Sequence, residues 1–395
     1  MSRNKFTIHD ILMQLVLVSP LAMLLQNRID SINRLLVGGI IIGLMIATFL
    51  RKRLNRRSAL ALISTCIVFG YSLFNINYRY FSVNMLFYFP LWVLYLLYSV
   101  DFTKFMMESF KRNKIVARAV IWVWSILVLI SFALPSSYTN GDFHSFAQGN
   151  FRFAPTVFFM GALIWAYSGM FEDKRYLIFM IVPFIAMIAT GSRTYTVIML
   201  IMFALAFYNY FENKKFFWIL LMPAFFLVVD VLAGSQFVSK FQRVMGNKYV
   251  KDPLAAITSN RSVFWLGELH LFESAGILEK LLGGGLTSSF VKNVSISGQA
   301  IWAHNDFLEV LNAHGICGIL IYFLCFFRAF KSYNKCYRYT LIQKLTFLSC
   351  LLLNAFFNGL YVYTTAMLSI PFFAYAVTID FGKKLREGIV NDISC

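Results

Sequence analysis

The densest group of reactive side chains lies where a polar segment meets an apolar run, at His304, Asn305 and Asp306. Asn305 or Asp306 predicts an N-cap, because a short polar side chain accepts hydrogen bonds from the free amides of a helix's first turn. His304 would then lie just outside the positive end of the helix dipole, which disfavours an imidazolium. A neutral imidazole is the form that a general base requires. The alternative is that His304 only assists the cap.

Two arginines are candidates for holding an anion. Arg193 follows Gly191 and Ser192 between two apolar runs, where a guanidinium is costly unless it has a partner or reaches water. Its planar fork of donors can grip a phosphate in two places, and Ser192 adds a hydroxyl. The alternative is an arginine that snorkels from a helix end. Arg261 stands four residues before Trp265, which can anchor at a membrane interface, and Arg261 is either part of a binding element or a solvated loop charge.

Further polar residues follow His304. Asp306 and Glu309 would occupy the first turn of the helix, where negative charge suits the dipole, and Asp306 is also a candidate to assist His304. His314 lies about two to three turns deeper and ~80° around the helix, so the two histidines are not expected to share a ligand. His314 either contacts substrate or hydrogen-bonds a neighbouring helix. No metal-ligand spacing recurs, so the sequence predicts neither a metal nor another cofactor.

The composition indicates that a membrane positions these residues. Apolar residues form 59% and charged residues 14% of the chain, whereas soluble domains carry about 45–50% and about 25%. A net charge of +18 would suggest nucleic acid as the partner of a soluble protein. Most Lys and Arg, however, stand in short segments between apolar runs, which favours a role in membrane orientation. We expect an all-α integral membrane protein with no nucleic-acid partner.

Twelve apolar stretches are candidates to cross about 30 Å of hydrocarbon as helices. Residues 1–233 are predicted to hold transmembrane helices 1 to 9, and residues 304–380 transmembrane helices 10 to 12, before a cytoplasmic tail at 381–395. The pair at 176–190 and 194–211 is either two spans or one broken helix. The stretches are 11–27, 35–50, 59–74, 84–100, 115–134, 154–171, 176–190, 194–211, 216–233, 307–327, 344–360 and 364–380.

The distribution of basic residues predicts the orientation of these spans. With the N-terminus inside, 24 of the 36 Lys and Arg fall in inward segments, 5 in short outward loops and 7 in the long loop. Cytoplasmic loops are enriched in Lys and Arg, so both termini are predicted in the cytoplasm. His304, Arg193 and Arg261 are then predicted at the outer face.

Residues 234–303 form a long outward connection among otherwise tight loops. An amphipathic stretch at 263–282 predicts short helices at the membrane surface, and Gly283, Gly284 and Gly285 predict a turn. Loops of this size often serve as lids or binding elements. No phosphate-binding P-loop is present, so ATP-driven transport lacks support.

Three short elements together resemble the O-antigen polymerase and O-antigen ligase family of bacterial surface-polysaccharide enzymes. The first is Gly191-Ser192-Arg193 at the start of a span. The second is Arg261 followed by Trp265 in the large loop. The third is His304-Asn305 with Leu308, Gly315 and Gly318 after it. Each element is weak alone, but their order and shared outward side around one large loop make the combination fairly specific.

The resemblance implies a metal-independent, inverting membrane glycosyltransferase of the GT-C type. Its donor would be a glycan on undecaprenyl pyrophosphate, whose diphosphate Arg193 and Arg261 would hold while His304 activates the acceptor hydroxyl. Ser192, Asn305, Asp306, Trp265 and His314 are further candidates for substrate binding. The enzyme would act at the outer face of a bacterial inner membrane, with membrane lipids, a lipid-linked glycan acceptor and a chain-length regulator protein as partners.

Three functions remain open from the sequence. The His-Asn-Asp-Phe-Leu-Glu run at 304–309 and the compact length favour a polymerase, which extends a lipid-linked glycan. A ligase would share the layout but transfer the glycan to lipid A core. A flippase for lipid-linked oligosaccharides would fit twelve spans equally well, but transporters often show repeated halves, and no internal symmetry is visible here.

Overall fold

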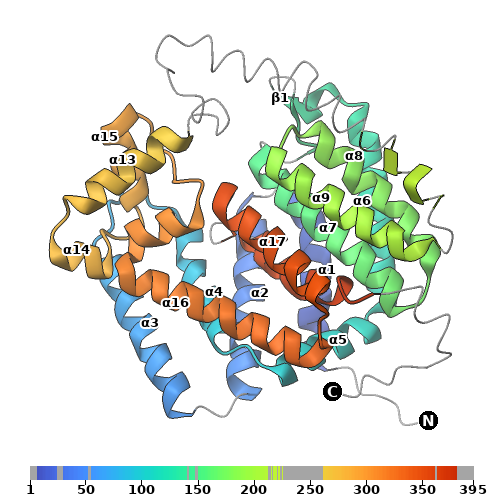
Figure 1. Ribbon diagram of the computed structural model, residues 1–395, viewed down its shortest axis with the longest axis horizontal. Coiled ribbons are helices and arrows are strands. Elements are labelled where there is room, and N and C mark those ends of the chain that lie inside the picture. Colours follow the sequence, from blue (N-terminus) through green and yellow to red (C-terminus); the bar gives the residue numbers. More distant parts are fainter. Residues whose placement is uncertain are drawn as a thin grey trace.

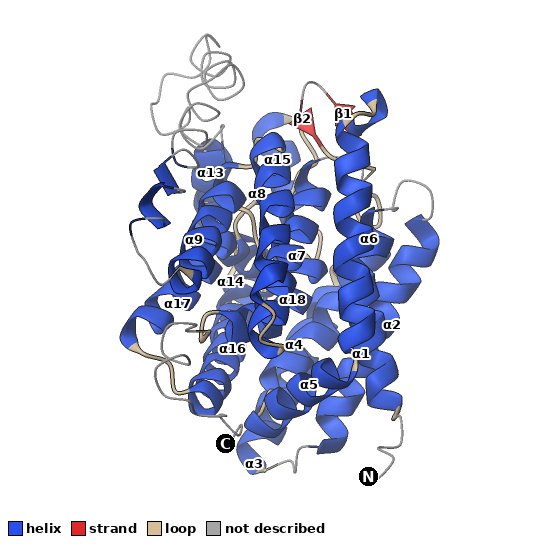
Figure 2. Ribbon diagram, turned by 90° about the vertical axis from the view of Figure 1, so that its right-hand side faces the viewer, coloured by secondary structure: helices blue, strands red, loops and turns tan. Residues whose placement is uncertain are grey.

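The computed structural model describes residues 7–24, 30–51, 55–139, 142–146, 150–211, 261–360 and 363–379, with a few positions between 215 and 225. In these residues the fold is all-α apart from one pair of two-residue antiparallel strands, which confirms the predicted class. Figures 1 and 2 show the arrangement of the helices. The α-helices are α1 (Ile8–Leu24), α2 (Asp30–Arg51), α3 (Arg56–Phe74), α4 (Tyr88–Leu96), α5 (Val100–Arg112), α6 (Lys114–Phe132), α7 (Asn150–Met170), α8 (Ile181–Ala189), α9 (Arg193–Tyr210), α13 (Arg261–Glu273), α14 (Ile277–Leu282), α15 (Ser288–Ser297), α16 (Asp306–Tyr337), α17 (Leu341–Phe357) and α18 (Thr364–Ala376). The 3-10 helices are η1 (Val83–Phe87), η2 (Pro135–Ser137) and η3 (Lys174–Met180), and the strands are β1 (Tyr138–Thr139) and β2 (Asp142–Phe143).

Several of these helices are long and apolar enough to cross a membrane. Among the described residues, α3, α6, Arg152–Met170 of α7 and α16 qualify by length and composition, and a bent pair gives a fifth candidate. Every predicted span except 216–233 coincides with helix, but five are shorter apolar helices. A helix of 17 residues rises only about 25 Å, less than the hydrocarbon thickness. By these criteria the described residues contain four or five candidate spans, fewer than the twelve predicted.

The connection after the fourth predicted span differs from the expectation. Residues 101–114 were assigned to an inward loop, whereas the structure forms α5 there, bent by 108° from the η1–α4 segment. Ser99 caps α5 by accepting a hydrogen bond from the amide of Phe102. Phe102, Met106 and Phe110 are buried while Lys111 is exposed, so α5 is amphipathic. A helix with one charged face contains no continuous apolar run, so the hydropathy of the sequence does not indicate it.

The ambiguous pair of stretches around Gly191 forms two helices. α8 ends at Ala189 and α9 begins at Arg193. Gly191 has a φ of +63°, which an L side chain rarely adopts, so the glycine permits the turn. The break places Arg193 in the first turn of α9.

The core lies around α7 and α18, which pack along each other. In the apolar stretch of α7 94% of residues are buried, whereas in that of α3 the share is 28%. Aromatic pairs such as Phe158 with Phe373 and Phe159 with Phe372 join the two helices at 5.6 and 5.5 Å. Helix α16 contacts α3, α4 and α5 and so connects this core to the loop region.

The described part of the predicted large loop consists of the short helices α13, α14 and α15, as expected from the sequence. They pack on one another and on α16 at one side of the molecule, opposite α6, α8 and α9 (Figure 1). Residues 226–260, most of the predicted ninth span and the predicted tail at 381–395 lie outside the described residues.

Candidate active site

His304 has a backbone conformation that few non-glycine residues adopt, with a φ of +54°. The preceding residue is held on both sides. The amide of Ala303 donates to Oε2 of Glu309 at 3.0 Å, and its carbonyl accepts from the indole of Trp265 at 2.8 Å. Asn305 caps α16, its Oδ1 accepting two amide hydrogen bonds from the first turn, as predicted. Strained backbone that the surroundings hold in place is often found at functional sites.

Helix α13 presents one functional face to α16 and α17. Arg261, Trp265 and Glu268 are spaced by four and three residues, so they lie on the same side of the helix. Nη1 of Arg261 donates to the carbonyl of Phe357, at the end of α17. Trp265 bonds the carbonyl of Ala303, next to His304. The face therefore connects the start of the loop helices with the start of α16.

Arg193, Arg261 and His304 share one electrostatic environment. Burial and the nearby charge of Arg261 lower the pKa of His304 to about 3. Burial and the charge of Arg193 lower the pKa of Arg261. The residues come from the starts of α9 and α13 and from the segment before α16. The fold thus brings together the two guanidinium groups and an uncharged imidazole.

Two aromatic residues that no sequence motif indicated, Trp302 and Tyr363, lie beside this group. Trp302 packs on the imidazole of His304 with ring centroids 4.3 Å apart. Tyr363 meets Trp302 edge-on at 5.5 Å, and Arg261 and Arg152 are among the charges that act on its hydroxyl. The only signal for Trp302 was its place two residues before His304. Tyr363 lies in the connection between the last two helices and carried no motif.

Asp306 and Ser192 make contacts within the protein. Asp306 is fully buried, and its Oδ2 accepts from the hydroxyl of Tyr322 and the amide of Leu360, both at 2.7 Å. It therefore joins α16 to the chain between α17 and α18. Ser192 precedes α9 and accepts, through its carbonyl, the hydroxyl of Thr196 at 2.7 Å. The substrate-binding roles of both, and of Asn305 and Trp265, stay predictions.

His314 lies away from the arginines, in the helix packing. It is fully buried, its Nδ1 is 2.7 Å from the hydroxyl of Ser72 in α3, and its ring packs against Phe69 and Trp92. The sequence left two interpretations of His314, and this contact agrees with a hydrogen bond to a neighbouring helix. Contact of His314 with substrate stays a prediction. His314 directly precedes a break in α16 at Gly315, where φ is +66° and ψ is −163°.

The glycine run explains how the loop accommodates that break. The amides of Gly284 and Gly285 donate to the carbonyls of Asn312 and Ala313 at 2.8 and 3.2 Å. A Cβ on Gly283 would approach the backbone of Ala313 to 2.3 Å, so only glycine permits this contact. The three glycines therefore form the predicted turn and also let the backbone of the loop contact α16 just before its break.

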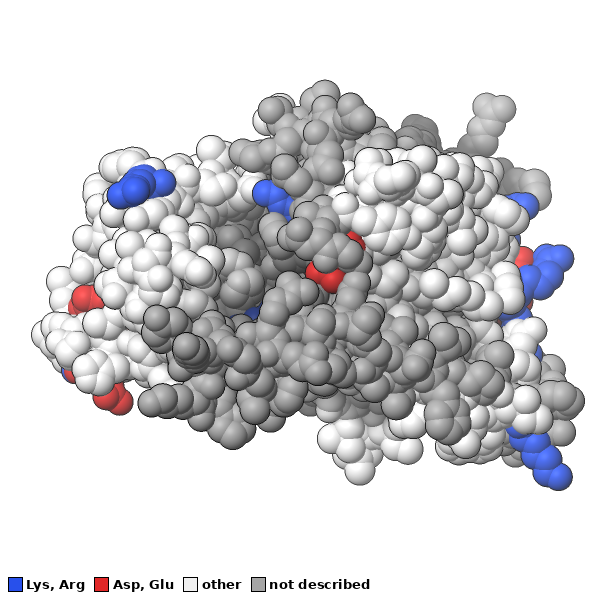
Figure 3. Space-filling view, turned by 90° about the horizontal axis from the view of Figure 1, so that it is seen from above, with Lys and Arg blue, Asp and Glu red and all other residues white. Residues whose placement is uncertain are grey.

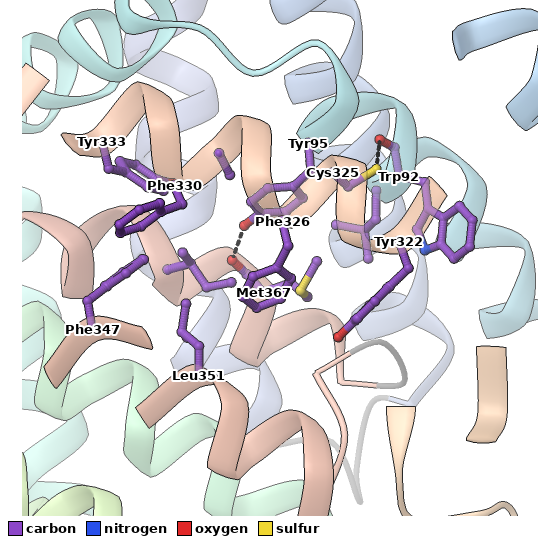
Figure 4. Close-up of a pocket in the computed structure, with 13 residues that line it drawn as sticks. Trp92, Tyr95, Tyr322, Cys325, Phe326, Phe330, Tyr333, Phe347, Leu351 and Met367 are labelled. Atoms are coloured by element: carbon purple, nitrogen blue, oxygen red, sulfur yellow. Dashed lines mark hydrogen bonds between the residues drawn. The ribbon is translucent and has the colours of Figure 1, made fainter. Parts of the chain in front are cut away.

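A small apolar cavity lies further along α16, between α4, α16, α17 and α18 (Figure 4). The hydroxyl of Tyr95 donates to the carbonyl of Met367 at 2.6 Å within it. The lining residues are Leu91, Trp92, Tyr95, Tyr322, Cys325, Phe326, Ala329, Phe330, Tyr333, Phe347, Leu351, Met367 and Ile370.

Seen from above, the surface is hollowed between the side of α13–α15 and the side of α6–α9 (Figure 3). Both basic and acidic side chains reach the surface near this hollow. Among the described residues, no group of three or more His, Cys, Asp or Glu could hold a metal ion.

Comparison of the chain with models of known protein families and with curated proteins found no match.

Proposed function

We propose that this chain is a membrane glycosyltransferase that joins oligosaccharide repeat units carried on undecaprenyl pyrophosphate into an O-antigen or capsular polysaccharide. One observation carries the proposal: an uncharged imidazole just before α16 lies close enough to Arg261 to feel its charge, and Arg261 feels the charge of Arg193 in the same way. Two guanidinium groups suit a diphosphate, and a neutral imidazole suits removal of a proton from a hydroxyl. The identity of the lipid-linked substrate rests on the resemblance of the sequence motifs.

The reaction uses these groups in one displacement. A hydroxyl oxygen of the acceptor sugar attacks the anomeric carbon of the donor, and His304 takes the hydroxyl proton. The bond from the anomeric carbon to the phosphate oxygen breaks, and its electron pair leaves with undecaprenyl pyrophosphate. Arg193 and Arg261 stabilise the charge that develops on this leaving group. Attack from the face opposite the leaving group inverts the anomeric carbon.

The low pKa of His304 gives the donor a second role. An imidazole with a pKa of about 3 is neutral but is a weak base at ordinary pH. A diphosphate bound between His304 and Arg261 would offset the arginine charge and raise the pKa of the imidazole. The site would therefore gain basicity only when the donor is present.

The proposal includes the finer topology that the sequence predicts. Twelve spans, with both termini in the cytoplasm, would place the active site at the outer face of a bacterial inner membrane. The acceptor would be a second lipid-linked repeat unit, and a chain-length regulator protein would act as a partner. The reaction is proposed to need no metal and no cofactor.

The test uses purified protein with an undecaprenyl-pyrophosphate repeat unit, and the products are sized on a gel. A ladder of products supports the polymerase. Transfer only after addition of core lipid would show a ligase, and lipid scrambling across liposomes without product would show a flippase. Either result overturns the proposal.

Arginine variants test the assigned roles. Arg261→Ala and Arg193→Ala should each lower turnover about 10²–10³-fold, as for the loss of one oxyanion donor. Arg79→Ala is the matched control, because Arg79 is exposed and packs on Tyr80 only at the surface. Equal activity of Arg261→Ala and Arg79→Ala would remove Arg261 from the mechanism.

A further inference from the structure

A second polar cluster is centred on Glu268, which lies on the same helix as Arg261. This side chain is fully buried on α13. Its Oε1 accepts from Nδ2 of Asn293 in α15 at 2.7 Å, and its Oε2 accepts from Nδ2 of Asn312 in α16 at 2.6 Å. One carboxyl group therefore joins three helices, with both oxygens engaged.

The environment of Glu268 makes this arrangement costly. Burial, together with the carboxylate of Glu309 in α16, raises the pKa of Glu268 to about 8, opposed by the two asparagine amides and by Lys292 of α15. Lys292 is 3.0 Å from Oδ1 of Asn312 and 3.3 Å from Oε1 of Glu279 in α14. A buried ionisable group is weak support for stability, because apolar packing often does as well. Directional bonds instead fix one geometry.

The geometry that Glu268 fixes is the placement of α13. Arg261 and Glu268 lie on one face of α13, seven residues and about 10 Å apart. Trp265 lies between them and bonds the residue before His304. Because Arg261 is the first residue of the helix, a small rotation of α13 about its Glu268 end moves the guanidinium relative to His304.

We propose that Glu268 is a positioning residue that holds Arg261 against His304 by fastening α13 to α15 and α16. The placement of α13 is inferred from the hydrogen bonds of Glu268 and Trp265. The effect of that placement on turnover rests on the proposed function. Nothing requires Glu268 to touch substrate.

The first test measures placement without any substrate. NMR titration of ring-labelled histidine gives the pKa of His304, whose signal is assigned by its loss in a His304→Gln variant. Moving Arg261 away should raise this pKa by about one unit, since a nearby like charge disfavours the imidazolium. We expect that rise in Glu268→Ala and a smaller one in Glu268→Gln, which keeps one acceptor oxygen. An unchanged His304 pKa in Glu268→Gln would overturn the proposal even where Glu268→Ala fails to fold.

Glu273→Gln is the matched control, since Glu273 is exposed at the other end of the same helix. It should leave the titration of His304 unchanged. A rise equal to that of Glu268→Gln would assign the effect to the charge of α13 in general and would overturn the proposal.

The second test measures turnover with the lipid-linked repeat unit. Glu268→Gln should lower kcat about tenfold with little change in KM, because charge on the leaving group develops only in the transition state. A wild-type protein without product would refute the proposed function, and the titration would still decide the placement. A shifted titration with unchanged kcat would overturn the catalytic consequence of the positioning.

Discussion

Helix α16 is held in two different ways on the two sides of its break at Gly315. Before the break, Asn305, Asp306, Glu309 and Asn312 are buried and hydrogen-bonded: Asn305 caps the first turn of α16, and the other three bond residues outside the helix. After the break, the side chains lining the cavity are mainly aromatic and apolar. The first half is held mainly by directional bonds and the second mainly by packing, although Tyr322 bonds Asp306 across the break and Arg328 donates to the carbonyl of Leu96.

The difference indicates where the molecule needs a single geometry. A buried polar group that loses its partner costs about 1–3 kcal/mol, so a satisfied polar network excludes alternative arrangements. Apolar side chains can adjust at lower cost when total volume is kept. The polar half carries the residues around His304, and the apolar half contains the cavity. Four predictions test this contrast, from the largest effect to the smallest.

The largest effect is expected from His304→Ala. Loss of a general base should lower kcat about 10²–10⁴-fold while binding of the donor is retained. The rate of polymer formation from a lipid-linked repeat unit measures kcat, and binding of undecaprenyl pyrophosphate measures whether the donor site is retained. His270→Ala is the matched control, because His270 is exposed on α13. A His304→Ala protein that still forms polymer at the wild-type rate would exclude the histidine as base.

The next effect concerns the break itself. Gly315→Ala should lower the free energy of unfolding by about 3 kcal/mol, because its φ is +66° and a Cβ would approach the backbone carbonyl of Leu281 to 2.5 Å. Gly39→Ala on α2 has open space around the added Cβ and should be neutral or stabilising by about 0.5–1 kcal/mol. Thermal unfolding in detergent compares the two. Equal melting temperatures of Gly315→Ala and Gly39→Ala would show that the contact between the loop and the break in α16 does not stabilise the fold.

The sequence predicted the elements of the polar half better than their connections. The apolar runs located the helices, and the N-cap was predicted at Asn305 or Asp306 because that signal is local; the structure places it at Asn305. The bond from Glu268 to Asn312 joins residues 44 positions apart, and neither residue carries a periodic signal. Tyr363 was likewise missed, because its place near Arg261 depends on how α18 packs.

The break and the amphipathic helix α5 were missed for a different reason. The non-helical residue Gly315 lies within a continuous apolar run, which predicts an unbroken helix. The close approach of the backbone of Leu281 and Gly283, 34 and 32 positions earlier, explains why a glycine is needed there. Helix α5 has the opposite character, since its charged face concealed a helix that packs through the other face. Patterns along the chain predict local structure, but not which backbone another segment will contact.

The third prediction is that the stability of the fold depends on pH through Glu268, a dependence that the apolar half of α16 does not provide. The pKa of Glu268 is raised in the folded protein to about 8, so the folded state binds a proton that the unfolded state releases at lower pH. Stability is therefore greatest below the ordinary carboxyl pKa and falls as the pH rises from about 4.5 to about 8. Glu268→Gln should flatten this part of the stability curve, measured as melting temperature against pH. An unchanged slope in Glu268→Gln would mean that other groups dominate.

The smallest effect is expected in the apolar half, from Tyr95→Phe. The change keeps the ring in the cavity and removes only the hydrogen bond to the carbonyl of Met367, which should cost about 0.5–1.5 kcal/mol. Tyr78→Phe is the control, because the side chain of Tyr78 is 83% exposed, so the loss of its hydroxyl should cost less. Neither change should move the titration of His304, since the hydroxyl of Tyr95 bonds Met367 in α18 and not the start of α16. A His304 pKa shifted by Tyr95→Phe would show that the cavity lining acts on the start of α16 through more than the bond between Tyr322 and Asp306.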